Sequence, residues 1–170
     1  MIYLIGYMGS GKSTVASVLS RKLNYEYIEM DQQIEQKEGL SIPEIFQKYG
    51  EAYFRKAESE LLQSISGDVI VSTGGGIVLS DENRKWLKGN TVVYLDASFE
   101  TIDERLSGDM SRPLWSGQKN ENNKRYEERL PLYQSSASCT VKVDGKEPEE
   151  IADEVLSCLN LQISGHNKER

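Results

Sequence analysis

Nine residues near the start of the chain, residues 6–14, have the types and spacing of a phosphate-binding loop. They read GYMGSGKST and fit the pattern Gly-x-x-x-x-Gly-Lys-Ser. In such a loop the glycines let backbone N–H groups turn toward an anion, and the helix that follows adds its positive end. We expect Lys12 to reach the β- and γ-phosphates of a nucleoside triphosphate and the Ser13 hydroxyl to bind Mg²⁺. The other predicted phosphate contacts are Gly9, Ser10, Gly11 and Thr14. A glycine-rich turn without a ligand is the alternative.

The rest of the chain narrows the class of nucleotide-binding protein. GTPase switches need a DxxG turn and an NKxD segment, and neither is present, since residues 123–126 read NKRY. The chain is also too short for the additional elements of a helicase or a transporter ATPase. A kinase that phosphorylates a small molecule is the natural interpretation. A nucleotide-binding module without activity is the alternative from another class.

Candidate acceptor-binding residues follow two further apolar runs. Asp31 comes shortly after the run 25–28, and three successive glycines at 74–76 follow the run 69–71. Ligands bind at the carboxyl ends of the strands in an open parallel sheet, so we expect both groups to face the phosphate loop. The glycines would let a ligand approach the backbone, whose N–H groups can bind oxygens.

Arg55 and Glu58 stand three positions apart in a helical pattern and can therefore pair on one face. Glu58 would then orient the Arg55 guanidinium. Each acceptor candidate also has a plainer interpretation. Asp31 could be a helix N-cap, Arg55 part of a surface ion pair, and residues 74–76 a simple turn.

The elements that must position these residues follow from hydrophobic periodicity. Apolar runs at residues 2–5, 25–28, 69–71, 92–95 and 139–143 predict strands. Helical spacing predicts helices at residues 14–23, 43–49, 51–65, 99–106, 122–134 and 148–159. Strands that alternate with helices indicate an α/β fold with a parallel sheet and helices on both faces.

The length of 170 residues predicts one domain, which we place at residues 1–160. Within it, residues 107–123 are polar yet contain Arg112, Pro113 and Trp115. An insert of this length is typical of a functional lid, with a disordered loop as the alternative. Residues 161–170 are polar and are expected to fray, and they include His166, the only histidine.

Composition excludes several partners. Lys and Arg number 20 and Asp and Glu 27, so the net charge of −7 gives no electrostatic footprint for nucleic acid or an anionic membrane. No apolar run approaches the roughly 20 residues of a membrane span. We therefore expect a soluble, cytoplasmic monomer. Cys139 and Cys158 lack metal-binding spacing and a secretory context, so two buried free thiols are expected.

Taken together, the motifs resemble the shikimate kinase family, within the structural group of the nucleoside monophosphate kinases. The resemblance extends to about Leu159. Its marks are GYMGSGKST, Asp31-x-x-Ile34-Glu35, Gly50-Glu51-x-x-Phe54-Arg55-x-x-Glu58, Ser72-Thr73-Gly74-Gly75-Gly76, Arg112-Pro113-Leu114 and Arg129-x-Pro131-Leu132-Tyr133. It implies a three-layer α/β/α, P-loop domain with a five-stranded parallel sheet. It also implies that ATP, with Mg²⁺, phosphorylates the 3-hydroxyl of shikimate.

The resemblance implies roles for individual residues. Shikimate, a small trihydroxy carboxylate, would be held by Asp31, Arg55, the Gly75 backbone and Arg129, with both arginines on the carboxylate. Asp31 would also accept the proton of the attacking hydroxyl, and Arg112 with Lys12 would stabilise the transferring phosphoryl group. Phe46 and Phe54 are candidates for the walls around the ring, with ordinary core packing as the alternative.

The chain departs from the family pattern in places. The family usually has an aspartate two residues before the catalytic one, which helps to position Mg²⁺ through water, and here Glu29 takes that place. Arg105 is the better candidate to stack on adenine, and Lys146 is a second one. Asp96 resembles the acid of a Walker B strand, but we favour a turn role. A related kinase acting on a sugar acid or a nucleotide is the alternative function.

Overall fold

The computed structural model describes residues 1–107 and 118–166, with side chains as far as residue 160. Its elements are β1 (Ile2–Ile5), α1 (Lys12–Leu23), β2 (Glu26–Glu29), α2 (Met30–Glu38), α3 (Ile42–Tyr49), α4 (Glu51–Ser64), β3 (Val69–Ser72), a 3₁₀ turn η1 (Ile77–Leu79), α5 (Asp81–Lys88), β4 (Val92–Asp96), α6 (Phe99–Ser107), α7 (Lys119–Ser136), β5 (Cys139–Lys142) and α8 (Pro148–His166). Along these ranges, no helix combines the length and the apolar character needed to cross a bilayer.

The strands form one parallel sheet of five strands in the order β2-β3-β1-β4-β5. β1 lies at its centre, where Leu4 is in register with Ser72 of β3 and with Val93 of β4. Every residue of β1 and β3 is buried, as expected for parallel strands that are covered on both faces. Because all strands run in the same direction, the segments that follow β1, β2 and β3 leave the sheet on the same side, at the carboxyl ends of the strands.

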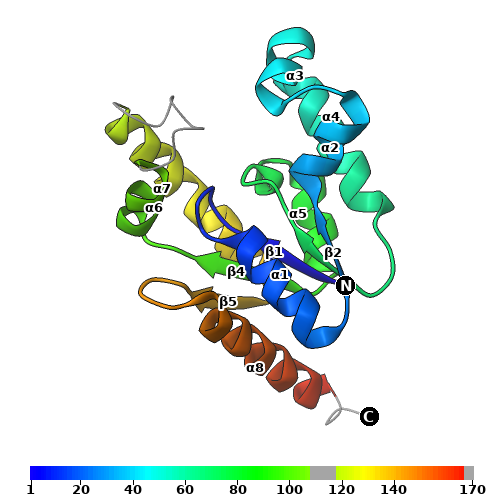
Figure 1. Ribbon diagram of the computed structural model, residues 1–170, viewed down its shortest axis with the longest axis vertical. Helices are drawn as coiled ribbons and strands as arrows, with labels where there is room; N and C mark the ends of the chain where they lie inside the picture. The colour runs from blue at the N-terminus through cyan, green and yellow to red at the C-terminus, as the bar shows by residue number, and fades with distance from the viewer. Residues whose placement is uncertain (108–117, 167–170) are drawn as a thin grey trace.

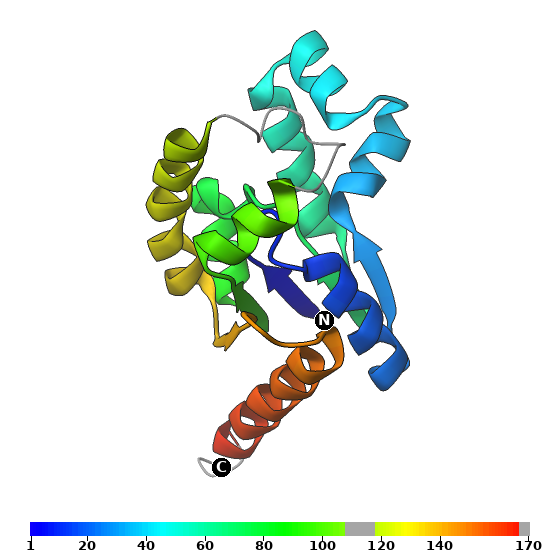
Figure 2. The ribbon, with the colours of Figure 1, turned by 60° about the vertical axis from the view of Figure 1, so that its left-hand side comes forward.

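Helices cover both faces of the sheet, so the predicted α/β/α layering is confirmed. Figures 1 and 2 show α1 and α8 packed together on one face, with α5 and α7 on the other. α2, α3 and α4 stand together beyond the edge of the sheet at which β2 ends. A second, smaller core of Ile34, Ile45 and Phe54 joins these three helices.

Local sequence explains the helices that periodicity missed. α5 begins after Ser80, whose side-chain oxygen accepts a hydrogen bond from the Asn83 backbone N–H at 3.3 Å. It buries only Asn83 and Leu87, so its apolar signal is weak. α2 likewise buries only Met30 and Ile34. Short polar helices of this kind carry little periodicity and depend on their caps and on their neighbours.

Two predicted boundaries differ from the structure. The predicted lid covers residues 107–123, but α7 begins at Lys119. Residues 119–123 therefore belong to a helix. Arg112, Pro113 and Trp115 lie outside the described residues. α8 continues to His166, whereas the predicted helix ends at residue 159 and the tail that we expected to fray begins at residue 161.

The prediction of two free thiols is wrong. Cys139, at the start of β5, and Cys158, on α8, form a disulfide with Cα atoms 6.4 Å apart. α8 packs back along β5, which brings together two residues separated by 19 positions in the chain. Neither the spacing of the cysteines nor the composition predicts this disulfide, because it depends on how α8 packs against β5.

Candidate active site

The loop between β1 and α1 has the backbone of a phosphate cradle. Gly9 and Gly11 adopt φ angles of 78° and 93°, in the left-handed region that favours glycine. α1 then starts at Lys12, so its unpaired N–H groups face the loop. The Lys12 side chain folds over this loop, where its ammonium donates hydrogen bonds to the carbonyl oxygens of Gly6 at 2.8 Å and Tyr7 at 3.0 Å.

A cleft of about 1110 Å³ opens above this loop. It gathers residues from the phosphate loop, the start of α2, α3, α4, the glycine run, α6 and α7. Of the residues predicted for the site, it is lined by Gly9, Ser10, Gly11, Lys12, Ser13, Thr14, Glu29, Asp31, Arg55, Gly75, Arg105 and Arg129. Arg112 lies outside the described residues. Sequence positions from 9 to 129 therefore converge on one cavity.

Glu29 ends β2 beside the loop, and Asp31 lies in the first turn of α2 rather than at its N-cap. Burial raises the pKa of Glu29, while the neighbouring Ser13 and Ser72 hydroxyls and the Lys12 ammonium oppose that rise. The Oε1 atom of Glu29 is buried without a hydrogen-bond partner among the described residues. A carboxylate oxygen and the Ser13 hydroxyl are ligands that suit Mg²⁺, so the residues present fit a magnesium ion held with phosphate oxygens.

Arg55 is fixed from two sides. Its Nη1 atom donates to Glu58 Oε2 at 2.9 Å, and its Nη2 atom donates to Glu51 at 3.2 Å. Glu58 is fully buried, and desolvation raises its pKa although the Arg55 charge opposes this. The plain surface ion pair is therefore excluded, since one partner is buried and the pair lines the cleft.

The glycine run makes room for charged side chains. A Cβ atom on Gly74 would lie 2.7 Å from Glu58 Oε1 and 2.8 Å from Asp31 Oδ1. A Cβ atom on Gly76 would overlap the guanidinium of Arg55, 2.6 Å from its Cζ atom. None of residues 74–76 has a left-handed φ angle. These glycines are needed for close approach and not for a special turn. Gly74 and Gly76 meet carboxylates and a guanidinium of the protein itself, and Gly75 meets the phosphate-loop backbone, with a Cβ atom 3.2 Å from Met8 N.

Arg129 enters the cleft from α7 and meets the middle of the glycine run. Its Nη1 atom donates to the Gly75 carbonyl oxygen at 3.4 Å, and the Tyr133 hydroxyl donates to the same oxygen. The Arg129 guanidinium also lies over the Tyr7 ring, 5.6 Å from its centroid. Arg129 therefore lies at Gly75 and Arg55 at Gly76, which brings two guanidinium groups to neighbouring positions of the cleft.

The aromatic candidates differ in burial, and the adenine-side candidates differ in their hydrogen-bond partners. Phe54 is 3% exposed and belongs to the second core, whereas Phe46 is 38% exposed, and both line the cleft. Arg105 donates to the Gly9 carbonyl oxygen at 2.9 Å. Lys146 also lines the cleft, but its ammonium pairs with Glu154 at 2.8 Å. Arg105 is thus tied to the phosphate loop and Lys146 to α8.

Proteins of known family resemble this chain along nearly its whole length. The family model described as shikimate kinase matches residues 8–160. The chain is 44% identical to shikimate kinase from Aquifex aeolicus over 168 residues, which covers 96% of this chain and 98% of that protein. It is 41% identical to shikimate kinase from Persephonella marina, covering 91% and 96% of the two chains. The chain belongs to the shikimate kinase family.

A solved structure supports the same assignment. Shikimate kinase from Acinetobacter baumannii in complex with shikimate has a TM-score of 0.88 and 33% identity to this chain, and the match covers 95% of this chain and 93% of that one. Members of the shikimate kinase family are phosphotransferases that act on a hydroxyl group of shikimate. The predicted family, fold class and enzyme class are therefore confirmed.

Sequence reasoning missed some residues that line the cleft or support it. Arg125 lines the cleft one helical turn before Arg129, and the spacing of these two arginines was the available signal. Glu51 holds Arg55, and Tyr133 holds Gly75, although both belong to motifs that carry the shikimate kinase resemblance.

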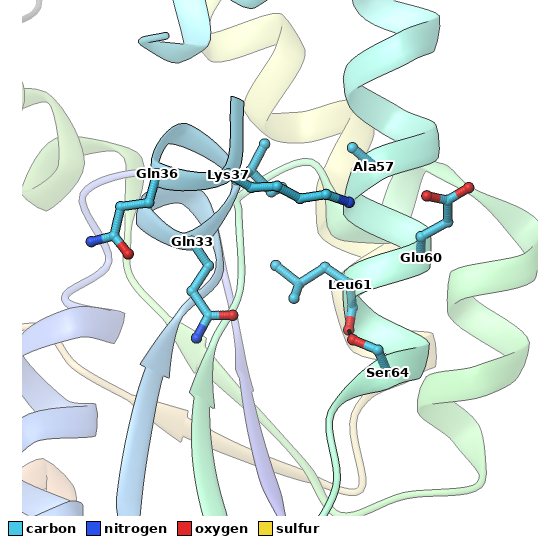
Figure 3. A pocket seen from close by; sticks show the side chains of 8 residues that line it. Gln33, Gln36, Lys37, Ala57, Glu60, Leu61 and Ser64 are labelled. Atoms are coloured by element: carbon cyan, nitrogen blue, oxygen red, sulfur yellow. Dashed lines mark hydrogen bonds between the residues drawn. The ribbon is translucent and has the colours of Figure 1, made fainter. Parts of the chain in front are cut away.

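A second cavity, of about 620 Å³, lies between α2 and α4 (Figure 3). Its lining is Gln33, Ile34, Gln36, Lys37, Ala57, Glu60, Leu61 and Ser64. Figure 3 shows amide, aliphatic and hydroxyl side chains with one lysine and one glutamate. It includes no residue of the phosphate loop or the glycine run, so it is separate from the chemistry described above.

Proposed function

We propose that the protein transfers the γ-phosphate of ATP to the 3-hydroxyl of shikimate and releases ADP. The observation that carries this proposal is the convergence of Lys12, Asp31, Arg55 and Arg129 on one cleft. Three of these groups come from different helices and one from the phosphate loop. We call the end of the cleft at Lys12 the donor end, where ATP would bind, and the end at Arg55 and Arg129 the acceptor end.

At the acceptor end, Arg55 and Arg129 would bind the shikimate carboxylate. Guanidinium groups suit this task because two parallel N–H groups match a planar carboxylate. Glu58 and Glu51 hold the Arg55 fork in place before the ligand arrives, which lowers the entropy lost on binding. The exposed ring of Phe46 would cover the apolar side of the bound ring.

At the junction of the two ends, Asp31 would orient the attacking hydroxyl and accept its proton. It lies beside Gly74, at the carboxyl edge of the sheet, in the first turn of α2. Phosphoryl transfer depends mainly on positioning and on charge stabilisation. Lys12 would supply that charge from the loop, and we propose the same task for Arg112, which lies outside the described residues.

Ser13 and Glu29 would hold Mg²⁺, Ser13 directly and Glu29 through water. Held there, Mg²⁺ would supply positive charge against the negative charge that develops during transfer. Glu29 is one methylene longer than the aspartate that is usual in the family, and its buried Oε1 atom is available for this contact. On the nucleotide side, Arg105 would contact adenine.

The cellular setting follows from the substrates. ATP and a soluble small acceptor suggest a cytoplasmic enzyme, and the net charge of −7 argues against nucleic acid or an anionic membrane as a partner. We propose a monomer because every group named above comes from one chain. Light scattering on the purified protein tests the oligomeric state.

The decisive experiment compares acceptors. ADP release should require shikimate and should stay at the background rate with gluconate or AMP, and phosphorus NMR of the product should locate the phosphate on the 3-oxygen. Turnover with gluconate or AMP in place of shikimate would favour a related sugar-acid or nucleotide kinase. Tight ATP binding without turnover on any acceptor would favour an inactive nucleotide-binding module.

A further inference from the structure

Arg125 is a cationic residue of the cleft for which the family resemblance gives no role. It lies on α7 four positions before Arg129, and both line the cleft. Residues at this spacing share one face of a helix. Arg125 is therefore on the cleft side of α7, one turn nearer to the helix start than the arginine that touches Gly75.

The orientation of this helix face is fixed by Tyr126. Its hydroxyl donates to the Ala97 carbonyl oxygen at 2.9 Å, and its side chain is largely buried. Its ring also packs edge-on against the Tyr7 ring, with centroids 5.5 Å apart. Because Tyr126 anchors α7 to the end of β4 and to the phosphate loop, the neighbouring Arg125 is held at a defined place beside that loop.

Tyr7 shows where the charge of Arg125 acts. Burial raises the pKa of the Tyr7 phenol, and the positive charges of Arg129 and Arg125, together with a side-chain hydrogen bond from Arg125, oppose that rise. The carbonyl oxygen of Tyr7 accepts a hydrogen bond from Lys12. Arg125 thus lies near a residue that touches Lys12 on the donor side and Arg129 on the acceptor side.

Acidic neighbours do not neutralise Arg125. Glu121 and Glu128 occupy the positions four before and three after it on α7, where ion pairs often form. Nevertheless, no ion pair joins Arg125 to any carboxylate within residues 1–107 and 118–160. Arg125 therefore lines the cleft beside Tyr7 with a positive charge that none of those carboxylates pairs with.

We propose that Arg125 binds the phosphate group once it is on the acceptor, and so determines the affinity for the phosphorylated product, an inference that rests on the proposed function. The phosphate ester brings a doubly charged group to the junction of the two ends, a group that the unphosphorylated acceptor lacks. A guanidinium can bind it through two parallel hydrogen bonds. Arg125 forms no covalent bond and moves no proton in this role.

The test measures binding of substrate and product separately. Calorimetry with shikimate 3-phosphate, shikimate and ADP is carried out on the wild type, Arg125→Gln and Arg125→Lys. Arg125→Gln should weaken product binding about tenfold or more, the usual loss for a hydrogen bond to a charged group. Shikimate and ADP affinities should change less than about twofold, within the range of a surface substitution. Arg125→Lys should recover part of the product affinity, because it keeps the charge and loses the fork.

Lys124→Gln is the matched control, since Lys124 is the exposed neighbouring cation on α7 and does not line the cleft. Equal losses for shikimate and product in Arg125→Gln would overturn the inference and make Arg125 part of the carboxylate anchor. A product affinity that matches the Lys124→Gln value would also overturn it. A wild type that does not phosphorylate shikimate would instead refute the proposed function, so the two failures are distinguishable.

Discussion

Arg55 and Glu58 form an ion pair in which Nη1 and Oε2 lie 2.9 Å apart and the Glu58 side chain is only 1% exposed. Such a pair has a cost, because burial disfavours the charged carboxylate. The pair nevertheless fixes the guanidinium at the acceptor end of the cleft. We therefore expect the Arg55–Glu58 pair to contribute more to acceptor binding than to the stability of the fold.

Arg55→Lys keeps the positive charge but removes the planar fork. Shikimate affinity should fall about tenfold or more, while ADP affinity should stay within about twofold of the wild type. Calorimetric titration with each ligand measures this. Arg21→Lys is the control, since Arg21 belongs to an exposed pair with Glu149 at 3.4 Å. If Arg55→Lys bound shikimate as tightly as Arg21→Lys, the anchor role would be lost.

Gly76→Ala should displace Arg55 without unfolding the protein. The new Cβ atom would overlap the end of a flexible side chain, which can move away at small cost. We therefore expect weaker shikimate binding, by about tenfold, with ADP binding preserved. Gly89→Ala is the matched control, because the nearest atom to a Cβ there is 3.6 Å away. A crystal structure of Gly76→Ala with Arg55 in its original place would contradict this account.

Glu58 should make stability depend on pH. Its pKa is raised in the folded protein, mainly by burial. Between the ordinary value and the raised value the folded state holds more protons than the unfolded state, so the unfolding free energy falls as pH rises through that window. Glu58→Gln cannot titrate. As pH rises from the ordinary pKa of a glutamate through the raised one, the wild type should lose stability relative to Glu58→Gln in urea titrations. Parallel pH profiles would show that Glu58 does not titrate in this window.

Asp31→Asn tests the proton acceptor. The amide keeps the shape of the carboxylate but cannot accept the hydroxyl proton, so single-turnover phosphoryl transfer should slow by on the order of 10² or more. Shikimate binding is measured separately by calorimetry, because Asp31 is also expected to hold the hydroxyl groups. Near-normal transfer in the variant would leave Asp31 with a binding role only. Unchanged ADP affinity serves as the control for an intact fold.

The disulfide between Cys139 and Cys158 should contribute to thermal stability. Closing a loop with a separation of 19 residues restricts the unfolded chain by about 3 kcal/mol. Reduction should therefore lower Tm by about 6–12 °C for a domain of this size. Cys158→Ser should show the same Tm with and without reductant. Kinase activity at 25 °C should persist in reductant, because neither cysteine lines the cleft. An unchanged wild-type Tm would mean that the thiols are not joined in solution.

The sequence allowed the phosphate loop and the sheet to be predicted because their signals are local. A loop of fixed spacing follows β1 directly, and buried strands such as β3 are continuous apolar runs. α5 was missed because its face is mostly polar, and its cap at Ser80 is a weak signal alone. The Cys139–Cys158 bond depends on long-range packing, which no local pattern records.

The candidate site shows the same division. Lys12, Ser13 and Asp31 could be placed from motifs and strand ends. The partners of the glycine run could not, because Gly74 and Gly76 meet side chains from α2 and α4 that are distant in the chain. The glycines signalled that something approaches the backbone, but not that it is Asp31, Glu58 and Arg55.

The fit between Gly76 and Arg55 has a consequence for altering this enzyme. A side chain at 76 would take the space that the Arg55 guanidinium fills, so the residue at 76 decides where the residue at 55 can lie, and a change of acceptor involves both positions. Libraries that vary 55 and 76 together therefore sample pocket shapes for neutral or cationic acceptors that a change at one position leaves out.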